Sequence, residues 1–168
     1  MIKRFVITGG PATGKSAIIK LLQQQHYHCF TEVSREIIDE KKIETSSKDF
    51  DFEAAVFDQR KIDFLAGNDL HFYDRSMLDG LAYMDINNIS IPKYMVEILR
   101  KHHYQKRVFY APIWKEIYTK DIQRLESIDE AIVIDKSLRK VYQAHGYELI
   151  ELPFTSIAER VNFILSKI

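Results

Sequence analysis

The stretch of sequence that decides the fold is Gly9-Gly10-Pro11-Ala12-Thr13-Gly14-Lys15-Ser16, near the amino end of the chain. A glycine, four residues and then Gly-Lys-Ser is the spacing of a loop that wraps the phosphates of a nucleotide. Glycines let the backbone turn tightly so that several N–H groups point inward, and the helix that follows adds positive potential. We therefore expect all eight residues to bind nucleotide phosphates.

The segments on both sides of this loop favour the same interpretation. Residues 2–8 are short, apolar and β-rich, which predicts a buried strand, and apolar residues recur at helical spacing over 14–25. A generic glycine turn before a helix is the alternative, but strand, loop and helix together are the context that the motif needs. We expect Lys15 to reach the β- and γ-phosphates of a nucleoside triphosphate, with ATP the leading choice, and Ser16 to ligate Mg²⁺.

The rest of the chain alternates short apolar segments with longer segments of helical periodicity. This alternation predicts a parallel sheet with helices on both faces. We therefore expect a three-layer α/β fold with a five-stranded parallel sheet, in a single domain over residues 1–168. The further strands are expected at 27–31, 70–73, 107–111 and 148–152, and the further helices at 32–42, 52–65, from near 77, 92–102, 117–143 with a bend near Ser127, and 156–168 with Thr155 as its cap.

Composition excludes several classes of protein. The 24 basic and 24 acidic side chains give a formal net charge of zero, which argues against a general nucleic-acid binder. No apolar stretch approaches the length that spans a membrane, so we expect a cytoplasmic protein with neither nucleic acid nor membrane as a partner, and a monomer or a homodimer. Cys29 is the single cysteine, which excludes an intrachain disulfide, and we expect a buried thiol.

A loop of this kind works with a carboxylate near the metal ion, usually at the end of a buried strand. The apolar segment 70–73 is followed by Asp74, which would lie at the carboxyl edge of the sheet beside the phosphate loop. There Asp74 could hold a Mg²⁺-bound water or accept the proton of an attacking hydroxyl. Asp is also a good helix N-cap, which is the alternative. Because the loop requires a carboxylate, we favour Asp74 as a catalytic and metal-binding residue.

Two resemblances narrow the class of protein. Tyr73-Asp74-Arg75-Ser76 resembles the acidic-Arg-Ser motif of nucleoside kinases and the Asp-Arg pair of thymidylate kinases. That resemblance implies that Asp74 serves as base or ligand of a metal-bound water, and that Arg75 contacts phosphates or holds the site together.

The second resemblance covers nearly the whole chain. The order of the phosphate loop, 31–36, 74–76, 114–124 and 142–153 looks like a family of small bacterial P-loop proteins labelled AAA-type ATPases, which lack AAA+ machinery. These proteins are similar to the ribosylnicotinamide-kinase domain of bifunctional NAD-synthesis regulators. The resemblance implies a kinase-like P-loop fold with a short helical lid.

Charged residues after the second strand are candidates for binding the phosphate acceptor. Glu32 and Arg35 lie where kinases of this shape face the acceptor; an acid can bind sugar hydroxyls, and an arginine can bind a phosphate or a carbonyl. A solvated helix start is an equally good interpretation of this pair. Gln59 could read the edge of a substrate base, and a surface position is its alternative.

A lid is expected at about 114–126, after the fourth strand. Arg124 is our candidate for neutralising charge on the transferred phosphoryl group, because Asp121 precedes it on the same helical face and could orient it. The alternative is a solvated charged face. Trp114 is expected to anchor the core rather than to stack on a ligand.

The leading hypothesis from the sequence is an ATP-dependent kinase of a small nucleoside-like or other hydroxylated metabolite, with ATP and Mg²⁺ as cofactors. Lys15, Asp74 and Arg124 are its expected catalytic residues. The alternative from another class is a regulatory or sensing ATPase that hydrolyses slowly and uses no small-molecule acceptor.

Overall fold

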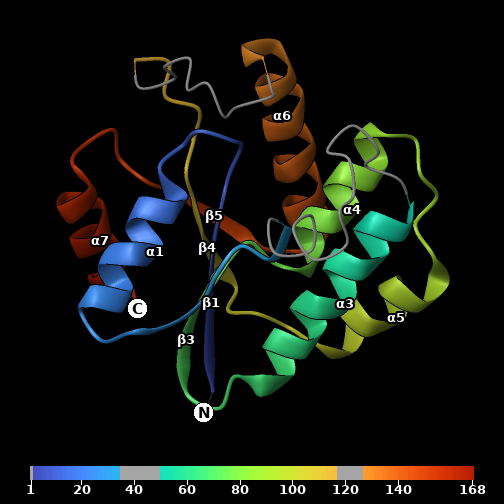
Figure 1. Ribbon diagram of the computed structural model, residues 1–168, viewed down its shortest axis with the longest axis horizontal. Coiled ribbons are helices and arrows are strands. Elements are labelled where there is room, and N and C mark those ends of the chain that lie inside the picture. Colours follow the sequence, from blue (N-terminus) through green and yellow to red (C-terminus); the bar gives the residue numbers. More distant parts are fainter. Residues whose placement is uncertain (1, 35–49, 117–126) are drawn as a thin grey trace.

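The computed structural model describes residues 2–34, 50–116 and 127–168. Five parallel strands form one sheet in the spatial order β2-β3-β1-β4-β5, so the first strand lies in the middle (Figure 1). The strands are β1 Lys3–Thr8, β2 His28–Phe30, β3 Leu70–Asp74, β4 Arg107–Tyr110 and β5 Glu148–Glu151.

Helices cover both faces of this sheet and complete a three-layer α/β fold (Figure 1). Two helices, α1 and α7, pack together on one face, whereas α3, α4, α5 and α6 lie on the other. Their bounds are α1 Lys15–Gln24, α3 Phe50–Ala66, α4 Met77–Ile86, α5 Lys93–Lys101, α6 Ile128–Ala144 and α7 Ile157–Leu165. In the described part of the chain, none of the helices has the length and apolar character needed to cross a bilayer.

The central strand β1 shows why the chain needs both helical layers. Successive side chains of a strand point to opposite faces. Val6 joins the core with α3, α4, α5 and α6, whereas Phe5 and Ile7 join the core with α1 and α7. Both faces of β1 are therefore buried, as is usual for a parallel sheet.

The strand order fixes where a ligand can bind. β1 pairs with β3 on one side and with β4 on the other. The chain leaves β1 toward the face covered by α1 and leaves β3 toward the face covered by α4, so the two connections separate at the carboxyl ends of these strands. Open α/β sheets bind ligands in the crevice at such a point. Ile7 is paired in register with Asp74, which brings the phosphate loop and the end of β3 together.

The five predicted strands and the parallel sheet are confirmed, each strand lying within about one residue of its expected bounds. Most of the helix predicted at 32–42 lies outside the described residues, and so does 117–126, with most of the expected lid. The described part of the helix predicted from 117 begins at Ile128, where Ser127 forms a capping box with Glu130. The single domain and its lid at 114–126 stay predictions.

Two local predictions are corrected. The N-cap of α7 is Ser156, not Thr155: the Ser156 hydroxyl accepts a hydrogen bond from the backbone N–H of Glu159, and the Glu159 carboxylate reaches back to the backbone N–H of Ser156. Ser156 caps the helix because Glu159 lies three residues after it, which is the spacing of a capping box, whereas Thr155 is four residues before Glu159. Cys29, expected to be buried, is half-buried in β2, and burial raises the pKa of its thiol to about 12.

Gly9 is the residue of the fold that tolerates a side chain least. Gly9 and Gly146 both have positive φ angles, of 142° and 79°. A Cβ on Gly9 would overlap the carbonyl oxygen of Ala111, whereas a Cβ on Gly146 would meet nothing within 4 Å. We expect Gly9→Ala to lower the free energy of unfolding by about 3 kcal/mol or more, and Gly146→Ala by only about 1 kcal/mol. Urea denaturation measures both, and equal losses would contradict the overlap at Gly9.

Candidate functional site

The phosphate loop leaves β1 at Thr8 and enters α1 at Lys15. Three of its residues, Gly9, Ala12 and Gly14, have positive φ angles, which is how the backbone reverses within so few residues. Gly14 is the N-cap of α1 and supplies no side-chain hydrogen bond to the helix. The first N–H groups of α1 are therefore left to bind an anion, and the helix dipole favours one there.

The side chain of Lys15 folds back onto the loop. It is buried, and its Nζ donates hydrogen bonds to the Gly10 carbonyl oxygen at 2.6 Å and to the Thr13 hydroxyl at 3.2 Å. Burial, reinforced by the charge of Arg75, lowers the pKa of Lys15 to about 7, although neighbouring carboxylates oppose that shift. An anionic phosphate beside Nζ would favour its charged form.

Asp74 ends β3 with its carboxylate inside the protein. Its Oδ1 atom is buried and has no hydrogen-bond partner in the described structure. Burial raises the pKa of Asp74 even though Lys15 and Arg75 favour its ionised form. The N-cap of α4 is Ser76, so the alternative role of Asp74 as a helix cap is wrong. An unpartnered buried carboxylate oxygen next to a phosphate loop suits a group that takes a proton or binds a cation.

Arg75 holds the end of β3 against the phosphate loop. It has a positive φ of 74°, and its guanidinium donates to Glu32 Oε1 at 3.0 Å, to the Gly9 carbonyl oxygen at 3.2 Å and to Asp79 Oδ1 at 3.4 Å. The strained backbone conformation is consistent with a side chain that the surroundings fix in place. Arg75 therefore stabilises the position of the phosphate loop through its hydrogen bond to Gly9. Its contact with phosphates stays a prediction.

Asp79 was missed by sequence reasoning. It is fully buried, and its carboxylate accepts hydrogen bonds from the hydroxyls of Thr8 and Tyr142, each at 2.5 Å, and from the backbone N–H of Ser76 at 2.8 Å. Burial alone would raise the pKa of Asp79, but nearby arginines and these hydrogen bonds hold it below its ordinary value. The Ser76-to-Asp79 capping-box spacing was a readable signal, whereas Tyr142 lies 63 residues away.

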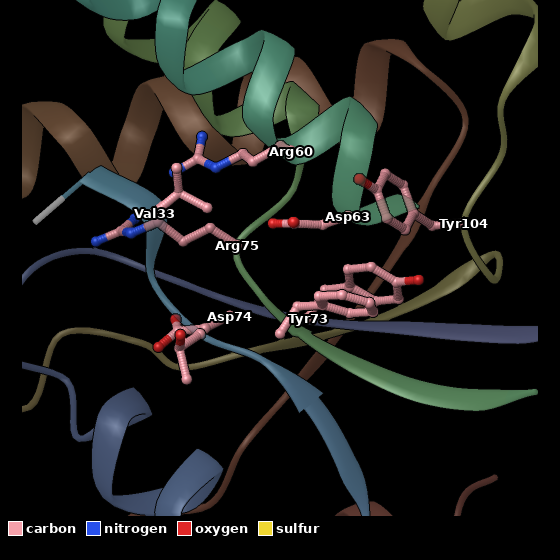
Figure 2. A pocket seen from close by; sticks show the side chains of 9 residues that line it. Val33, Arg60, Asp63, Tyr73, Asp74, Arg75 and Tyr104 are labelled. Carbon is pink, nitrogen blue, oxygen red and sulfur yellow. The ribbon is translucent and has the colours of Figure 1, made fainter. Parts of the chain in front are cut away.

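A small pocket opens beside Asp74 on the side away from α1 (Figure 2). Figure 2 shows the rings of Tyr73 and Tyr104 on one side of this pocket and the Asp74 carboxylate toward the other. Arg60 of α3 is buried and donates to the Ser76 carbonyl oxygen at 3.0 Å, and its buried Nε atom has no partner among the described residues. The residues lining the pocket are Phe30, Thr31, Val33, Arg60, Asp63, Tyr73, Asp74, Arg75 and Tyr104.

The structure brings some of the predicted acceptor residues to this region and not others. Glu32 reaches it through its ion pair with Arg75. Gln59 is half-buried and donates a hydrogen bond to Asp63 along α3 at 3.0 Å, but it does not line the pocket. The neighbouring Arg60, which the sequence did not single out as a ligand, lines the pocket instead. Both Gln59 and Glu32 stay predictions as substrate ligands.

The acceptor candidate Arg35 and two residues of the predicted lid, Arg124 and Trp114, have different outcomes. Arg35 and Arg124 lie outside the described residues and stay predictions. Trp114 does not anchor the core: it is half-buried, and its ring packs against Phe154, itself 54% exposed, with ring centroids 5.4 Å apart. Trp114 lies a few residues after the end of β4 and belongs to neither of the two core clusters that cover the sheet.

Solved structures of two kinases and of NadR protein have this fold. Deoxyadenosine kinase from M. mycoides with bound dATP has a TM-score of 0.71 at 16% identity, with 98% of this chain and 98% of that chain covered. NadR protein in complex with NR has a TM-score of 0.75 at 13% identity, with 98% of this chain but 50% of that chain covered. Shikimate kinase from Aquifex aeolicus has a TM-score of 0.58 at 15% identity, with 98% and 94% covered.

Fold and site together define a P-loop protein of the kinase-like α/β class, which confirms the predicted fold class. The chain belongs to the family described as "AAA domain", whose model matches residues 4–160. The resemblance to AAA-type ATPases and to kinase-like P-loop proteins is therefore confirmed. A comparison with curated proteins finds no match.

The Glu32–Arg75 ion pair predicts a pH-dependent stability. Burial favours the neutral form of Glu32, but Arg75, Lys15 and Arg60 outweigh it and lower its pKa from 4.5 to about 2. This stabilisation is present above pH 4.5 and is lost as the pH falls toward 2. We expect Glu32→Gln to lower the free energy of unfolding at pH 7 by about 1–3 kcal/mol and to flatten its slope over that acidic range.

Chemical denaturation at a series of pH values measures this effect. The matched control is Glu151→Gln, which removes one partner of an exposed pair with Arg139 and should change stability by about 0.5 kcal/mol or less. An unchanged acidic slope in Glu32→Gln would contradict the assignment.

The Tyr142 hydroxyl predicts a second effect. Tyr142→Phe removes a buried donor to Asp79 that also pairs with the Ser76 hydroxyl at 2.5 Å, so we expect a loss of about 2–3 kcal/mol. Tyr147→Phe removes a half-buried hydroxyl that accepts from the Tyr104 N–H at 3.3 Å, and should cost about 0.5–1 kcal/mol. Thermal and urea unfolding compare the two variants, and a smaller loss for Tyr142→Phe would show that Asp79 does not depend on this hydroxyl.

Proposed function

We propose that this protein is an ATP-dependent kinase that transfers the γ-phosphoryl group of ATP to a hydroxyl of a small nucleoside-like or other hydroxylated metabolite. The observation that carries the proposal is the position of Asp74. Its unpartnered carboxylate oxygen lies between a phosphate loop and an aromatic-lined pocket, where a phosphate donor and a hydroxyl acceptor would meet. The kinases that share the fold support the same reaction class.

The donor side of the proposed reaction uses the loop and Lys15. The backbone N–H groups of Gly9 to Ser16 would bind the phosphates, and Nζ of Lys15 would exchange its bonds to Gly10 and Thr13 for the β- and γ-phosphates. Arg75 supports this geometry because it ties Gly9 to the end of β3. Arg124 is proposed to cover the transferred group from the lid.

On the acceptor side, Asp74 receives the proton. The acceptor oxygen bonds to the γ-phosphorus, the bond from that phosphorus to the bridging oxygen of ADP breaks, and the hydroxyl proton passes to the Asp74 carboxylate. A pKa raised by burial suits this role, because it makes the carboxylate a stronger base. The acceptor would lie beside Asp74, with Glu32, Arg35 and Gln59 as its proposed polar ligands. The rings of Tyr73 and Tyr104 are buried and form one wall of the pocket.

The residues fit a magnesium ion. Ser16 is exposed in the first turn of α1, and Asp74 presents a carboxylate oxygen that has no partner among the residues the structure describes. Mg²⁺ is usually bound by one or two protein groups together with substrate phosphates and water. When bound, the ion neutralises charge on the β- and γ-phosphates.

Asp74→Asn and Lys15→Ala test this proposal. With ATP, Mg²⁺ and a panel of nucleosides and sugars, we expect the wild-type protein to release ADP only when an acceptor is present. Asp74→Asn should lower kcat by about 10²–10⁴-fold with a small change in ATP affinity, because the base is removed and the phosphate loop is kept. Lys15→Ala should abolish ATP binding as well as turnover.

The matched control is Asp85→Asn at the exposed end of α4, which should leave turnover unchanged because Asp85 pairs with Lys140 at the surface. Slow ADP release that no acceptor stimulates would contradict the kinase and support the regulatory ATPase instead. Normal ATP turnover by Lys15→Ala would refute the site.

A further inference from the structure

Arg160 connects the last helix to the phosphate loop. It lies in α7, is only 1% exposed, and donates a hydrogen bond from NH1 to the carbonyl oxygen of Thr13 at 2.8 Å, across 147 residues of chain. Its Nε atom is buried and has no hydrogen-bond partner among the residues that the structure describes. No sequence motif pointed to this residue, and the reaction proposed above assigns it no role.

In the described part of the chain, the charge of Arg160 has no acidic partner. Within residues 2–34, 50–116 and 127–168, no carboxylate forms an ion pair with it, whereas Arg75 pairs with Glu32 and Asp79. Burial lowers the pKa of Arg160, which reflects the cost of keeping its charge out of water. A buried cation without a counterion destabilises a protein unless something else compensates it.

The position of the contact suggests what that compensation is. The structure has no cis peptide bond among the described residues, so the carbonyl of Thr13 and the N–H of Gly14 point in opposite directions. Because Arg160 holds the carbonyl from behind, the N–H of Gly14 is directed away from Arg160. A Cβ on Gly14 would lie 2.9 Å from NH1, so the guanidinium packs directly against this peptide.

We propose that Arg160 is a positioning residue of the nucleotide site, which orients the Thr13–Gly14 peptide of the phosphate loop and supplies a buried positive charge that is compensated when the phosphates of a nucleoside triphosphate bind. The inference rests on the proposed binding of ATP. It adds a second, distant part of the chain to a site that the sequence motif confines to eight consecutive residues.

Arg160→Met tests this role, because methionine fills similar buried space without charge. We expect the nucleotide-free variant to be as stable as the wild-type protein or more stable, since an uncompensated buried charge is removed. We expect its Kd for ATP, and for inorganic tripolyphosphate, to rise about tenfold or more, because both ligands depend on the phosphate loop. Arg160→Lys keeps the charge, so its Kd values should lie between those of the wild-type protein and those of Arg160→Met. Calorimetry gives the affinities, and urea unfolding gives the stabilities.

The matched control is Arg4→Met, because Arg4 also donates to backbone carbonyls, those of Phe64 and Gly67, but at the opposite end of β1. It should leave both Kd values unchanged. If the wild-type protein binds neither ligand, the proposed function fails first. If the wild-type protein binds and Arg160→Met binds equally well, only the role of Arg160 is overturned.

Two further outcomes also decide the question. If Arg160→Met binds ATP more weakly but binds tripolyphosphate as well as the wild-type protein does, the proposed role is overturned. Arg160 would then affect the binding of the nucleoside part of ATP and not that of the phosphates. If Arg160→Met does not fold, Arg160→Lys carries the test: normal stability with an affinity between about two- and tenfold weaker supports the role, and unchanged affinity overturns it.

Discussion

The buried carboxylate of Asp79 is the interaction on which the geometry of this site depends. Its donors come from the end of β1, the start of α4 and the last turn of α6, so one side chain joins three elements of the fold. A buried carboxylate without such donors would be strongly destabilising, so these elements can meet only in an arrangement that satisfies it. Arg75 links Asp79 to the phosphate loop, because its guanidinium donates hydrogen bonds to both the Asp79 carboxylate and the Gly9 carbonyl oxygen.

The charges around the loop are arranged for an anion. Lys15 is buried on the loop, and burial lowers its pKa. Arg160 is buried behind the loop and pairs with no carboxylate of the described residues. In a low-dielectric surrounding, both cations are costly in the absence of an anion and interact strongly with one. Asp74 favours a cation or a proton instead. Burial disfavours its negative charge and raises its pKa, and a bound cation or proton would neutralise that charge. Such opposed preferences in neighbouring groups are typical of sites that bind or transfer charged groups.

The position of the pocket relative to the loop follows from the sheet order. β1 lies between β3 and β4, so the loop after β1 and the residues after β3 share one edge of the sheet. The loop is therefore bounded by α1 and α7 on one face, while the pocket is bounded by α3 and the aromatic side chains on the other (Figures 1 and 2). Asp74 is at the boundary of the two because its strand is the one that separates them.

The sequence by itself determined the phosphate loop, the five strands and the place of Asp74, because each of these depends on neighbouring residues: backbone freedom at glycines, short apolar segments and the end of such a segment. Only the tertiary structure decided that Tyr142 satisfies Asp79, that Arg60 rather than Gln59 lines the pocket, and that Arg160 supports Thr13. These contacts join residues far apart in the chain, and no local spacing encodes them, since they depend on which helix the folded sheet brings to which strand end. For the same reason Trp114 could not be placed, because periodicity does not tell where the core ends beyond β4.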